Sequence, residues 1–221
     1  MIYFVGAGSG APDLITVRGA RLLSEADVIV YAGSLVNPAL LDYKKDGCEV
    51  YNSAKMTLEE VIAVMAPAAK AGKTVVRLHT GDPCVYGAHR EQMDELDRLG
   101  LAYEVCPGVS SFCGAAAALK AEYTLPNVSQ SVILTRMEGR TPVPEKEQIE
   151  SFAAHGATMV IFLSIGLVAK VQEALLAGGA YTADTPAAVV YKATWPEQRV
   201  VRCTVGSLAE STKAAGITKT A

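Results

Sequence analysis

The sequence lacks the features that mark several large classes of protein. Its 221 residues carry nearly balanced charge, with 20 Lys and Arg against 23 Asp and Glu, so there is no excess of positive charge to bind a nucleic-acid backbone. Its five cysteines are scattered and form no C-x-x-C pair, which indicates reduced thiols in a cytoplasmic protein rather than a secreted disulfide framework. Because the charge is balanced, we expect no nucleic-acid partner.

We also expect neither a membrane span nor a leader peptide. The apolar stretch 158–171 is interrupted by Ser164 and Gly166 and falls short of the ~18 residues of a membrane span. The N-terminal MIYFVGAGSG lacks the basic region, apolar region and cleavage site of a secretion signal. What the chain does have is 50% hydrophobic residues, enough for a sizeable core, which excludes disorder as its main state and leaves a protein without a membrane partner.

Short β-rich runs alternate with amphipathic helical patterns along the first half of the chain. The strand-like runs are 2–5, 28–31, 74–78 and 102–105, and the helical patterns are 17–25, 58–70 and 88–99. This order predicts an α/β fold with a mainly parallel sheet.

The segment 107–126 has the composition of a passage between two domains. It holds a Pro-Gly turn, two serines, a run of small residues and a proline exit. We predict an N-terminal α/β domain over 1–113 and a C-terminal α/β domain over 114–221, with a ligand cleft between them. Strand-like runs at 131–135, 158–163, 187–191 and 199–204, the last reading as the second arm of an antiparallel pair, predict a mixed sheet in the second domain.

A glycine-rich loop, GAGSGA at 6–11, follows the first strand and satisfies the dinucleotide fingerprint. Two observations argue against that reading: Pro12 delays the next helix to about Thr16, and no acidic residue follows the strand at 28–31 to hold a ribose. An NAD(P)-binding oxidoreductase remains an alternative, and so does a tight turn without a ligand.

A second motif, TGDPCVYG at 80–87, lies at the carboxyl end of a strand, where open α/β sheets bind ligands. Its two glycines allow close backbone approach. Asp82 can accept hydrogen bonds from ribose hydroxyls or attract a cation, and Tyr86 offers a ring and a hydroxyl. The structural alternative is an Asx turn at Asp82, but loops at strand ends carry function often enough that we favour ligand binding.

A third motif, CPGVSS at 106–111, follows the next strand. Ser110 and Ser111 can cap the following helix and present backbone N–H groups to a carboxylate. We expect no metal site, because the spacing of His79, Asp82, Cys84 and His89 matches no familiar zinc pattern.

Together, in this order and spacing, the motifs resemble the tetrapyrrole methylase family, which uses S-adenosylmethionine. The segments that carry the resemblance span essentially the whole chain: GAGSGAPDLITVRGARLL, ADVIVYAGSLV, LHTGDPCVYGAHREQ, EVCPGVSS and TMVIFLSIG. Within the family, YAGSLV, TGDPCVYG and TRMEGRTPVPE are similar to the members that methylate C11 of precorrin-4 or its cobalt form in cobalamin biosynthesis.

The resemblance implies two α/β domains with the cofactor between them. It also implies a C-methyltransferase that converts S-adenosylmethionine to S-adenosylhomocysteine, a tetrapyrrole polycarboxylate as substrate, and a cytoplasmic homodimer. The alternatives are a methyltransferase of the precorrin-2, precorrin-3 or uroporphyrinogen-III stage, and a noncatalytic module that binds tetrapyrrole or S-adenosylmethionine.

The resemblance also implies site residues, although no catalytic residue and no metal ligand. The cofactor contacts are Ser9, Thr80, Gly81, Asp82, Val85, Tyr86, Ser110, Ser111, Phe162, Leu163, Ala187 and Ala188. Of these, Phe162 and Leu163 would flank the adenosine, and the two alanines would contact adenine through their backbone. The substrate-binding candidates are Asp13, His89, Arg136, Glu138 and Arg140. A polycarboxylate requires local basic groups, which favours the two arginines, although a solvated hairpin is their alternative.

Two departures from the family pattern remain. In the G-x-G-P-G-D loop, Ser9 replaces the proline and Ala11 the aspartate, so the role of that acid is in doubt unless Asp13 substitutes for it. We also expect the last strand of the family fold to be missing after residue 221.

Overall fold

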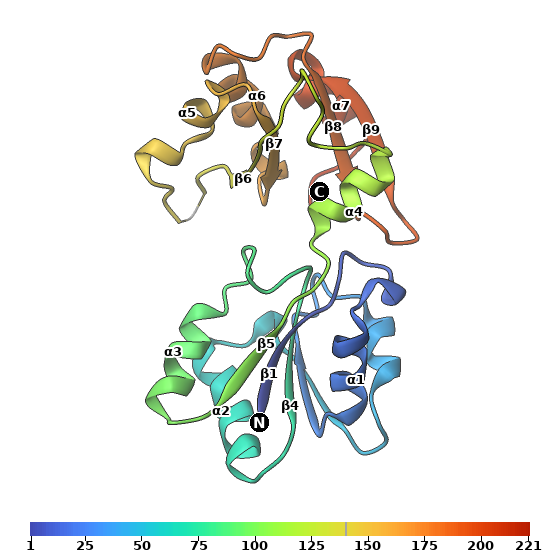
Figure 1. Cartoon of the computed structure of the whole chain (residues 1–221), viewed down its shortest axis with the longest axis vertical. Coiled ribbons are helices and arrows are strands. Elements are labelled where there is room, and N and C mark those ends of the chain that lie inside the picture. Colours follow the sequence, from blue (N-terminus) through green and yellow to red (C-terminus); the bar gives the residue numbers. More distant parts are fainter. Residues whose placement is uncertain (140) are drawn as a thin grey trace. The chain divides into compact units, whose positions relative to one another are not determined.

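The computed structural model describes residues 1–139 and 141–221. The chain divides into two compact units, Met1–Gly114 and Ala115–Ala221. Both are built from strands and helices (Figure 1), which confirms the predicted α/β class.

The first unit is built on a five-stranded sheet in the order β3-β2-β4-β1-β5, and every pair of neighbours is parallel. Its elements are β1 (Ile2–Gly6), η1 (Pro12–Leu14), α1 (Val17–Glu25), β2 (Val28–Tyr31), η2 (Pro38–Tyr43), β3 (Glu49–Asn52), η3 (Ser53–Lys55), α2 (Leu58–Lys70), β4 (Val75–His79), α3 (Arg90–Arg98) and β5 (Tyr103–Cys106). Helix α4 (Ser111–Leu119) follows and carries the chain into the second unit.

Helices cover both faces of this sheet (Figure 1). On one face α1 buries Leu22 and Leu23 against the sheet, and on the other α2 buries Met65 and α3 buries Leu96. Helix α2 begins at a capping box, in which the Thr57 hydroxyl accepts from the Glu60 N–H while the Glu60 carboxylate accepts from the Thr57 N–H. The sequence pattern therefore places these helices correctly, because each has one apolar stripe to bury.

The order of the strands creates a switch point at the carboxyl edge of the sheet. Strands β1 and β4 are neighbours, but β1 leads to α1 on one face while β4 leads to α3 on the other. The loops after these two strands therefore diverge at the edge where open α/β sheets bind ligands.

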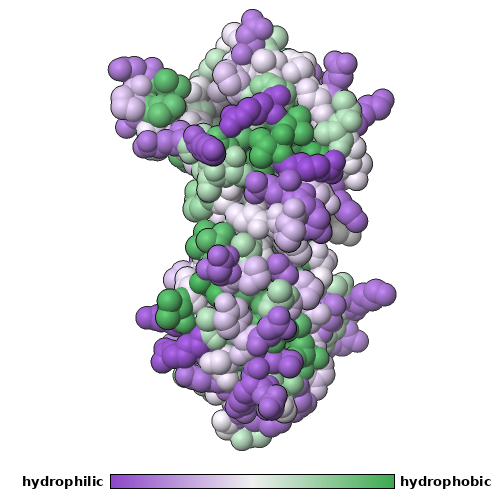
Figure 2. Space-filling view, turned by 90° about the vertical axis from the view of Figure 1, so that its right-hand side faces the viewer, coloured by the Kyte–Doolittle hydropathy of each residue, from purple (hydrophilic) through white to green (hydrophobic). Residues whose placement is uncertain are grey.

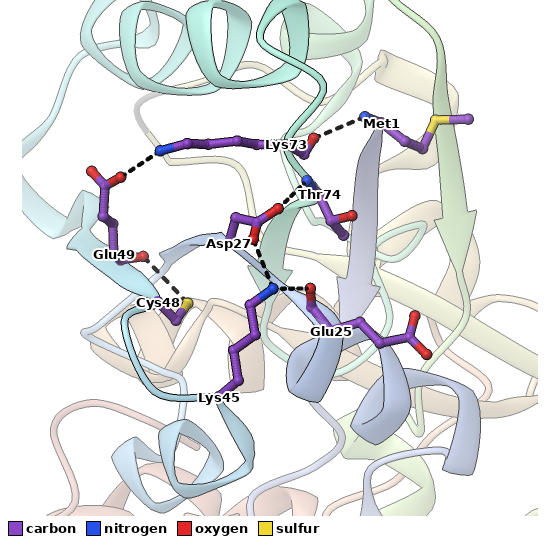
Figure 3. A network of polar contacts seen from close by, with 8 residues as sticks. All are labelled: Met1, Glu25, Asp27, Lys45, Cys48, Glu49, Lys73 and Thr74. Carbon is purple, nitrogen blue, oxygen red and sulfur yellow. Dashed lines mark hydrogen bonds and ion pairs between the residues drawn. The ribbon is translucent and has the colours of Figure 1, made fainter.

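The opposite edge of the sheet is tied together by charged groups (Figure 3). The Asp27 carboxylate accepts from Lys45 Nζ at 2.7 Å and from the Thr74 N–H at 2.8 Å, and these bonds, with that to Lys45 the largest cause, lower the pKa of Asp27. Lys73 Nζ donates to the Glu49 carboxylate at 2.8 Å, and the Lys73 backbone carbonyl accepts from the N-terminal amino group. The starts of strands β1 to β4 are thus linked by polar contacts.

The second unit combines two small sheets with helices. Its elements are β6 (Val132–Arg136), η4 (Glu145–Glu147), α5 (Ile149–Ala153), β7 (Thr158–Phe162), η5 (Ile165–Leu167), α6 (Val168–Ala177), β8 (Pro186–Tyr191), β9 (Arg199–Thr204), η6 (Val205–Ser207) and α7 (Leu208–Ala214). Strands β6 and β7 are parallel, and β8 and β9 are antiparallel as their sequence pattern predicts.

The expected mixed sheet differs in one respect. Both strand directions are present, but they form two separate two-stranded sheets within the described residues. The sheets share a core instead of backbone hydrogen bonds, because Ile149, Val171, Leu175, Val189 and Leu208 from α5, α6, β8 and α7 form one buried cluster.

No helix in the described ranges has both the length and the apolar character needed to cross a membrane.

Candidate functional site

Three glycines bring the loops after β1, β4 and β5 into direct backbone contact. A Cβ on Gly108 would lie 2.2 Å from the Gly81 carbonyl oxygen and 2.7 Å from Gly6 Cα, and a Cβ on Gly6 would lie 2.5 Å from Gly108 Cα. Gly8 and Gly81 also exchange backbone hydrogen bonds of 3.2 and 2.9 Å. Glycine is required at Gly6 and Gly108 because a Cβ there would collide with the neighbouring backbone, and at Gly81 because its φ is +60°.

This packing argues against the hypothesis that the glycine-rich loop after β1 binds a dinucleotide. The loop is paired with Gly81 instead of standing open, and helix α1 begins only at Val17, after the 3-10 turn η1. Its N-cap is Thr16, whose hydroxyl accepts from the Gly19 N–H. A pyrophosphate in the glycine loop would therefore not face a helix N-terminus as the fingerprint requires.

Asp82 joins two of the loops through its carboxylate. One oxygen accepts from the Cys84 N–H at 2.8 Å, which is the Asx turn given above as the structural alternative, and the other accepts from the Gly108 N–H at 2.8 Å. Its neighbour Thr80 donates its hydroxyl to the Leu35 carbonyl at 3.4 Å, which adds the loop after β2. Asp82 thus has a positioning task that is independent of any ligand.

We expect Asp82→Asn to lower kcat/KM of the proposed reaction by roughly 100-fold, because an amide can accept only one of the two N–H groups and turns a donor toward the other. Steady-state kinetics would measure the loss. Asp94→Asn is the matched control, since Asp94 is an exposed acid that pairs with Arg90 on the surface of α3. Equal activity of the two variants would contradict the prediction.

The segment after Asp82 is strained and partly exposed. Tyr86 and Ala88 have positive φ angles of 55° and 48°, which non-glycine residues rarely adopt, and Tyr86 is 42% exposed. Val85 N–H donates to the Asp82 carbonyl within the same turn. His89, the N-cap of α3, packs its ring 5.6 Å from that of Phe4. Strain of this kind persists only where neighbouring contacts hold it.

His79, the last residue of β4, lies beneath this segment. The residue is 3% exposed and its ring packs against those of Phe4 and His89, and its Nε2 has no hydrogen-bond partner among the residues that the structure describes. Burial, with the positive charge of Arg77 as the next cause, lowers the pKa of His79 to about 3. The imidazole is therefore neutral at physiological pH.

Ser110 and Ser111 lie at the start of α4, beside Gly81. A Cβ on Gly81, whose φ is +60°, would meet Ser110 Cα at 3.5 Å and the Ser111 nitrogen at 3.6 Å. The Ser110 carbonyl accepts from the Cys113 N–H at 3.0 Å in the first turn of the helix. The start of α4 faces Gly81, and backbone N–H groups at the start of a helix favour a small anionic group such as a carboxylate.

The two candidates in the loop after β1 lie at the same edge of the sheet. Ser9 is buried, and Asp13 is exposed in the 3-10 turn η1.

In the second unit, the ends of β6 and β7 are joined by Ser164. Its hydroxyl donates to the Phe162 carbonyl at 2.6 Å and accepts from the Met137 N–H at 2.7 Å. Leu163, which lies between Phe162 and Ser164 in the sequence, is 66% exposed and has a φ of 56°. The predicted adenosine contacts Phe162 and Leu163 therefore adjoin the start of the predicted substrate loop.

Arg136 is used to shape that loop. Its Nη1 donates to the carbonyls of Met137 and Thr141, at 3.4 and 3.2 Å, and its Nη2 donates to the Pro142 carbonyl at 2.9 Å. Glu138 is exposed, and Arg140 lies outside the described residues. The sequence predicts Arg136 only as a basic group for the substrate. The structure shows that it also holds the loop by donating hydrogen bonds to the loop's carbonyls.

Ala187 and Ala188 lie in β8, opposite Cys203 and Arg202 of β9. Because β8 has β9 as its single partner among the described residues, its other edge carries backbone groups outside the sheet, as the predicted backbone contacts require.

Each unit therefore gathers its own share of the predicted residues. The first brings those of the β1, β4 and β5 loops to one edge, and the second places Phe162 and Leu163 beside Arg136. Sequence reasoning did not identify Gly108 or Ser164 as site residues, and only the Pro107-Gly108 turn motif gave any signal. Over the described part of the chain, no three His, Cys, Asp or Glu side chains are grouped to hold a metal ion.

Comparison with known proteins agrees with this arrangement. Residues 1–209 match the family model of the tetrapyrrole (corrin/porphyrin) methylases. The chain belongs to this family. It is 55% identical to the cobalt-precorrin-4 C(11)-methyltransferase of Methanocaldococcus jannaschii over 100% of this chain and 85% of that protein. It is 46% identical to the precorrin-4 C(11)-methyltransferase of Pseudomonas aeruginosa, over 100% of this chain and 87% of that protein.

Solved structures of family members show the same fold. The crystal structure of a cobalt precorrin-4 methyltransferase superposes with a TM-score of 0.96 at 50% identity and covers 99% of this chain and 91% of its own. Uroporphyrin-III C-methyl transferase from Thermus thermophilus, in complex with S-adenosyl homocysteine, superposes with a TM-score of 0.78 at 29% identity, over 95% of this chain and 85% of its own. The resemblance to the tetrapyrrole methylases is thus confirmed.

Proposed function

We propose that the chain is an S-adenosylmethionine-dependent methyltransferase that methylates C11 of precorrin-4 or its cobalt form in cobalamin biosynthesis. The observation that carries this proposal is the match, at 55% identity over 100% of this chain and 85% of the relative, to a protein named for that reaction. The superposition on a cobalt precorrin-4 methyltransferase, at a TM-score of 0.96, supports it.

The residues at the carboxyl edge of the first unit fit the chemistry of the cofactor. We assign its carboxylate to the backbone at Gly81 and the start of α4, where Ser110 and Ser111 lie, because backbone N–H groups at the start of a helix favour an anion. When bound, S-adenosylmethionine supplies a methyl group on a positively charged sulfur. Ser9, Thr80, Val85 and Tyr86 surround the same edge in this proposal. In the second unit, Phe162, Leu163, Ala187 and Ala188 would contact the adenosine.

Methyl transfer of this kind is a displacement in line with the breaking carbon–sulfur bond, so positioning of the two reactants and exclusion of water can supply most of the acceleration. The task of the chain is then to hold loops in place. Asp82 fixes two of them through backbone N–H groups, and the arginine at 136 fixes the loop we assign, with Glu138 and Arg140, to the substrate. His89 and Asp13 are the further substrate candidates.

A direct assay tests the function. Purified protein with S-adenosylmethionine and precorrin-4, in its metal-free and cobalt forms, should give a product heavier by one methyl group, located at C11 by NMR. Uroporphyrinogen-III serves as the competing substrate. A thermal shift with S-adenosylhomocysteine but not with NAD(P) is expected beside it. Methylation of uroporphyrinogen-III alone would assign another stage of the pathway, and binding without product would indicate a noncatalytic module.

We expect Arg136→Ala to raise KM for the tetrapyrrole about 10-fold or more while leaving the affinity for S-adenosylhomocysteine within about 2-fold, because the loop loses the donor to three of its carbonyls. Kinetics with calorimetry would separate the two. Arg98→Ala, which removes an exposed surface arginine of α3, is the control. A loss confined to S-adenosylhomocysteine affinity would overturn the assignment.

A cytoplasmic homodimer is part of the same proposal. It is supported by exposed apolar side chains such as Val17 and Val128, which are 90% and 75% exposed, and by apolar surface visible among hydrophilic side chains in Figure 2. Sedimentation equilibrium at micromolar concentration would show a dimer, and a monomer at that concentration would contradict it.

A further inference from the structure

A buried pair of polar side chains lies behind the strained segment Tyr86–His89. Arg77 on β4 and Gln92 on α3 are each 6% exposed. Arg77 Nε donates to Gln92 Oε1 at 3.0 Å, and Arg77 Nη1 donates to the Val30 carbonyl at 3.2 Å. No ion pair with Arg77 is found within the described ranges. Burying a charge without an opposite charge is costly, so the pair calls for an explanation.

The contact with Arg77 fixes which way the Gln92 amide faces. Arginine is a donor only, so the atom that it contacts must be the amide oxygen, and the amide nitrogen must point the other way. That nitrogen, Nε2, donates to the Ala88 carbonyl at 3.2 Å. The guanidinium therefore orients the amide, and the amide holds a backbone carbonyl of the loop.

The Ala88 carbonyl belongs to a loop in which non-glycine residues adopt unfavourable backbone angles. Ala88 has a φ of 48° and Tyr86 a φ of 55°, and between them a Cβ on Gly87 would lie 2.0 Å from the Pro83 carbonyl oxygen. Space for relaxation exists, because a cavity of about 400 Å³ is lined by Arg77, Ala88 and Gln92 among other residues. Without the hydrogen bond to the Ala88 carbonyl, the segment would relieve its backbone strain by moving into this cavity.

We infer that Gln92, oriented by Arg77, is a positioning residue that holds Tyr86–His89 in the conformation required for methyl transfer. The inference rests on the proposed function for its effect on catalysis, since Tyr86 and His89 are assigned to the site there. Its effect on the loop does not depend on what the enzyme methylates.

The decisive variant is Gln92→Glu. A carboxylate still accepts from Arg77, and it even supplies the missing opposite charge, but it has no hydrogen to donate to the Ala88 carbonyl. We expect the variant to keep its thermal midpoint within a few degrees. The amides of residues 85–89 should exchange with solvent about 10-fold faster, and kcat for the tetrapyrrole should fall about 10-fold with KM changed by less than about 3-fold. A merely structural pair predicts unchanged exchange and unchanged kcat.

Two further comparisons complete the test. In Gln92→Glu combined with Ala88→Gly, glycine adopts the positive φ without help, so part of kcat should return. Gln172→Glu is the matched control, because Gln172 Oε1 accepts from the Ala209 N–H at 2.9 Å and a carboxylate can do the same.

A measurement on the unaltered protein keeps the test independent of how the variants fold. The side-chain amide proton of Gln92 that is donated to the Ala88 carbonyl should exchange slowly with solvent in NMR spectra. Exchange as fast as that of an exposed glutamine would overturn the inference, as would a folded Gln92→Glu protein with wild-type loop exchange and kcat. If the wild-type enzyme does not methylate precorrin-4, the proposed function fails while the exchange data still decide the role of Gln92.

Discussion

Gly108→Ala is expected to destabilise the first unit by about 3 to 5 kcal/mol, enough to leave much of the protein unfolded at 37 °C. The new Cβ would lie 2.2 Å from the Gly81 carbonyl oxygen and 2.7 Å from Gly6 Cα. Both are backbone atoms of neighbouring strand ends, so neither can rotate away as a flexible side chain would. Relief requires the ends of β1, β4 and β5 to separate.

Urea unfolding followed by circular dichroism would measure this loss. Gly139→Ala is the control, because a Cβ at Gly139 has nothing within 4 Å. We expect it to change the free energy of unfolding by less than about 0.5 kcal/mol. If Gly108→Ala were as stable as this control, the three-glycine junction would not be the tight contact described here.

The second large effect is the acid sensitivity conferred by His79. Burial lowers the pKa of its imidazole from 6.5 to about 3 in the folded protein. Between these two values the unfolded chain binds a proton that the folded chain does not, so stability falls as the pH falls through this window. From pH 7.5 to pH 5 the loss due to this one group is about 2 kcal/mol.

His79→Gln should remove this contribution, since an amide of similar length does not titrate. We expect the free energy of unfolding of the wild type to drop by about 2 kcal/mol more than that of the variant between pH 7.5 and pH 5. Urea titrations at the two pH values would show the difference. His155→Gln, at an exposed position near the end of α5, should leave the pH dependence unchanged. Parallel pH profiles for the wild type and His79→Gln would contradict the proposed burial.

Much of the first unit can be predicted from the sequence because its periodic elements bury one face each. The helices α1 and α2 and the strand β2 have the predicted bounds, and the other strands shift by a residue or so. Strand β3, Glu49–Asn52, was not predicted. It is a polar edge strand with exposed ends that pairs only with β2, so it has no alternating apolar pattern to reveal it.

The site is less predictable, because its key contacts join residues that are far apart in the chain. The TGDPCVYG motif predicts that Asp82 matters, but its partner Gly108 is 26 residues away and is brought close only by the order of the strands. Gln92 looks like one more polar residue on a charged helix, since nothing local shows that it faces Arg77 rather than solvent.

The two edges of the first sheet differ in what holds them together. At the amino edge, long side chains such as Lys45 and Lys73 reach their partners across exposed surface (Figure 3), and such contacts tolerate exchange of one charged residue for another. At the carboxyl edge, backbones touch directly. An engineer who wished to raise the melting temperature would therefore work on the amino edge, where new ion pairs and shorter loops can be introduced without moving any atom of the proposed methyl-transfer site.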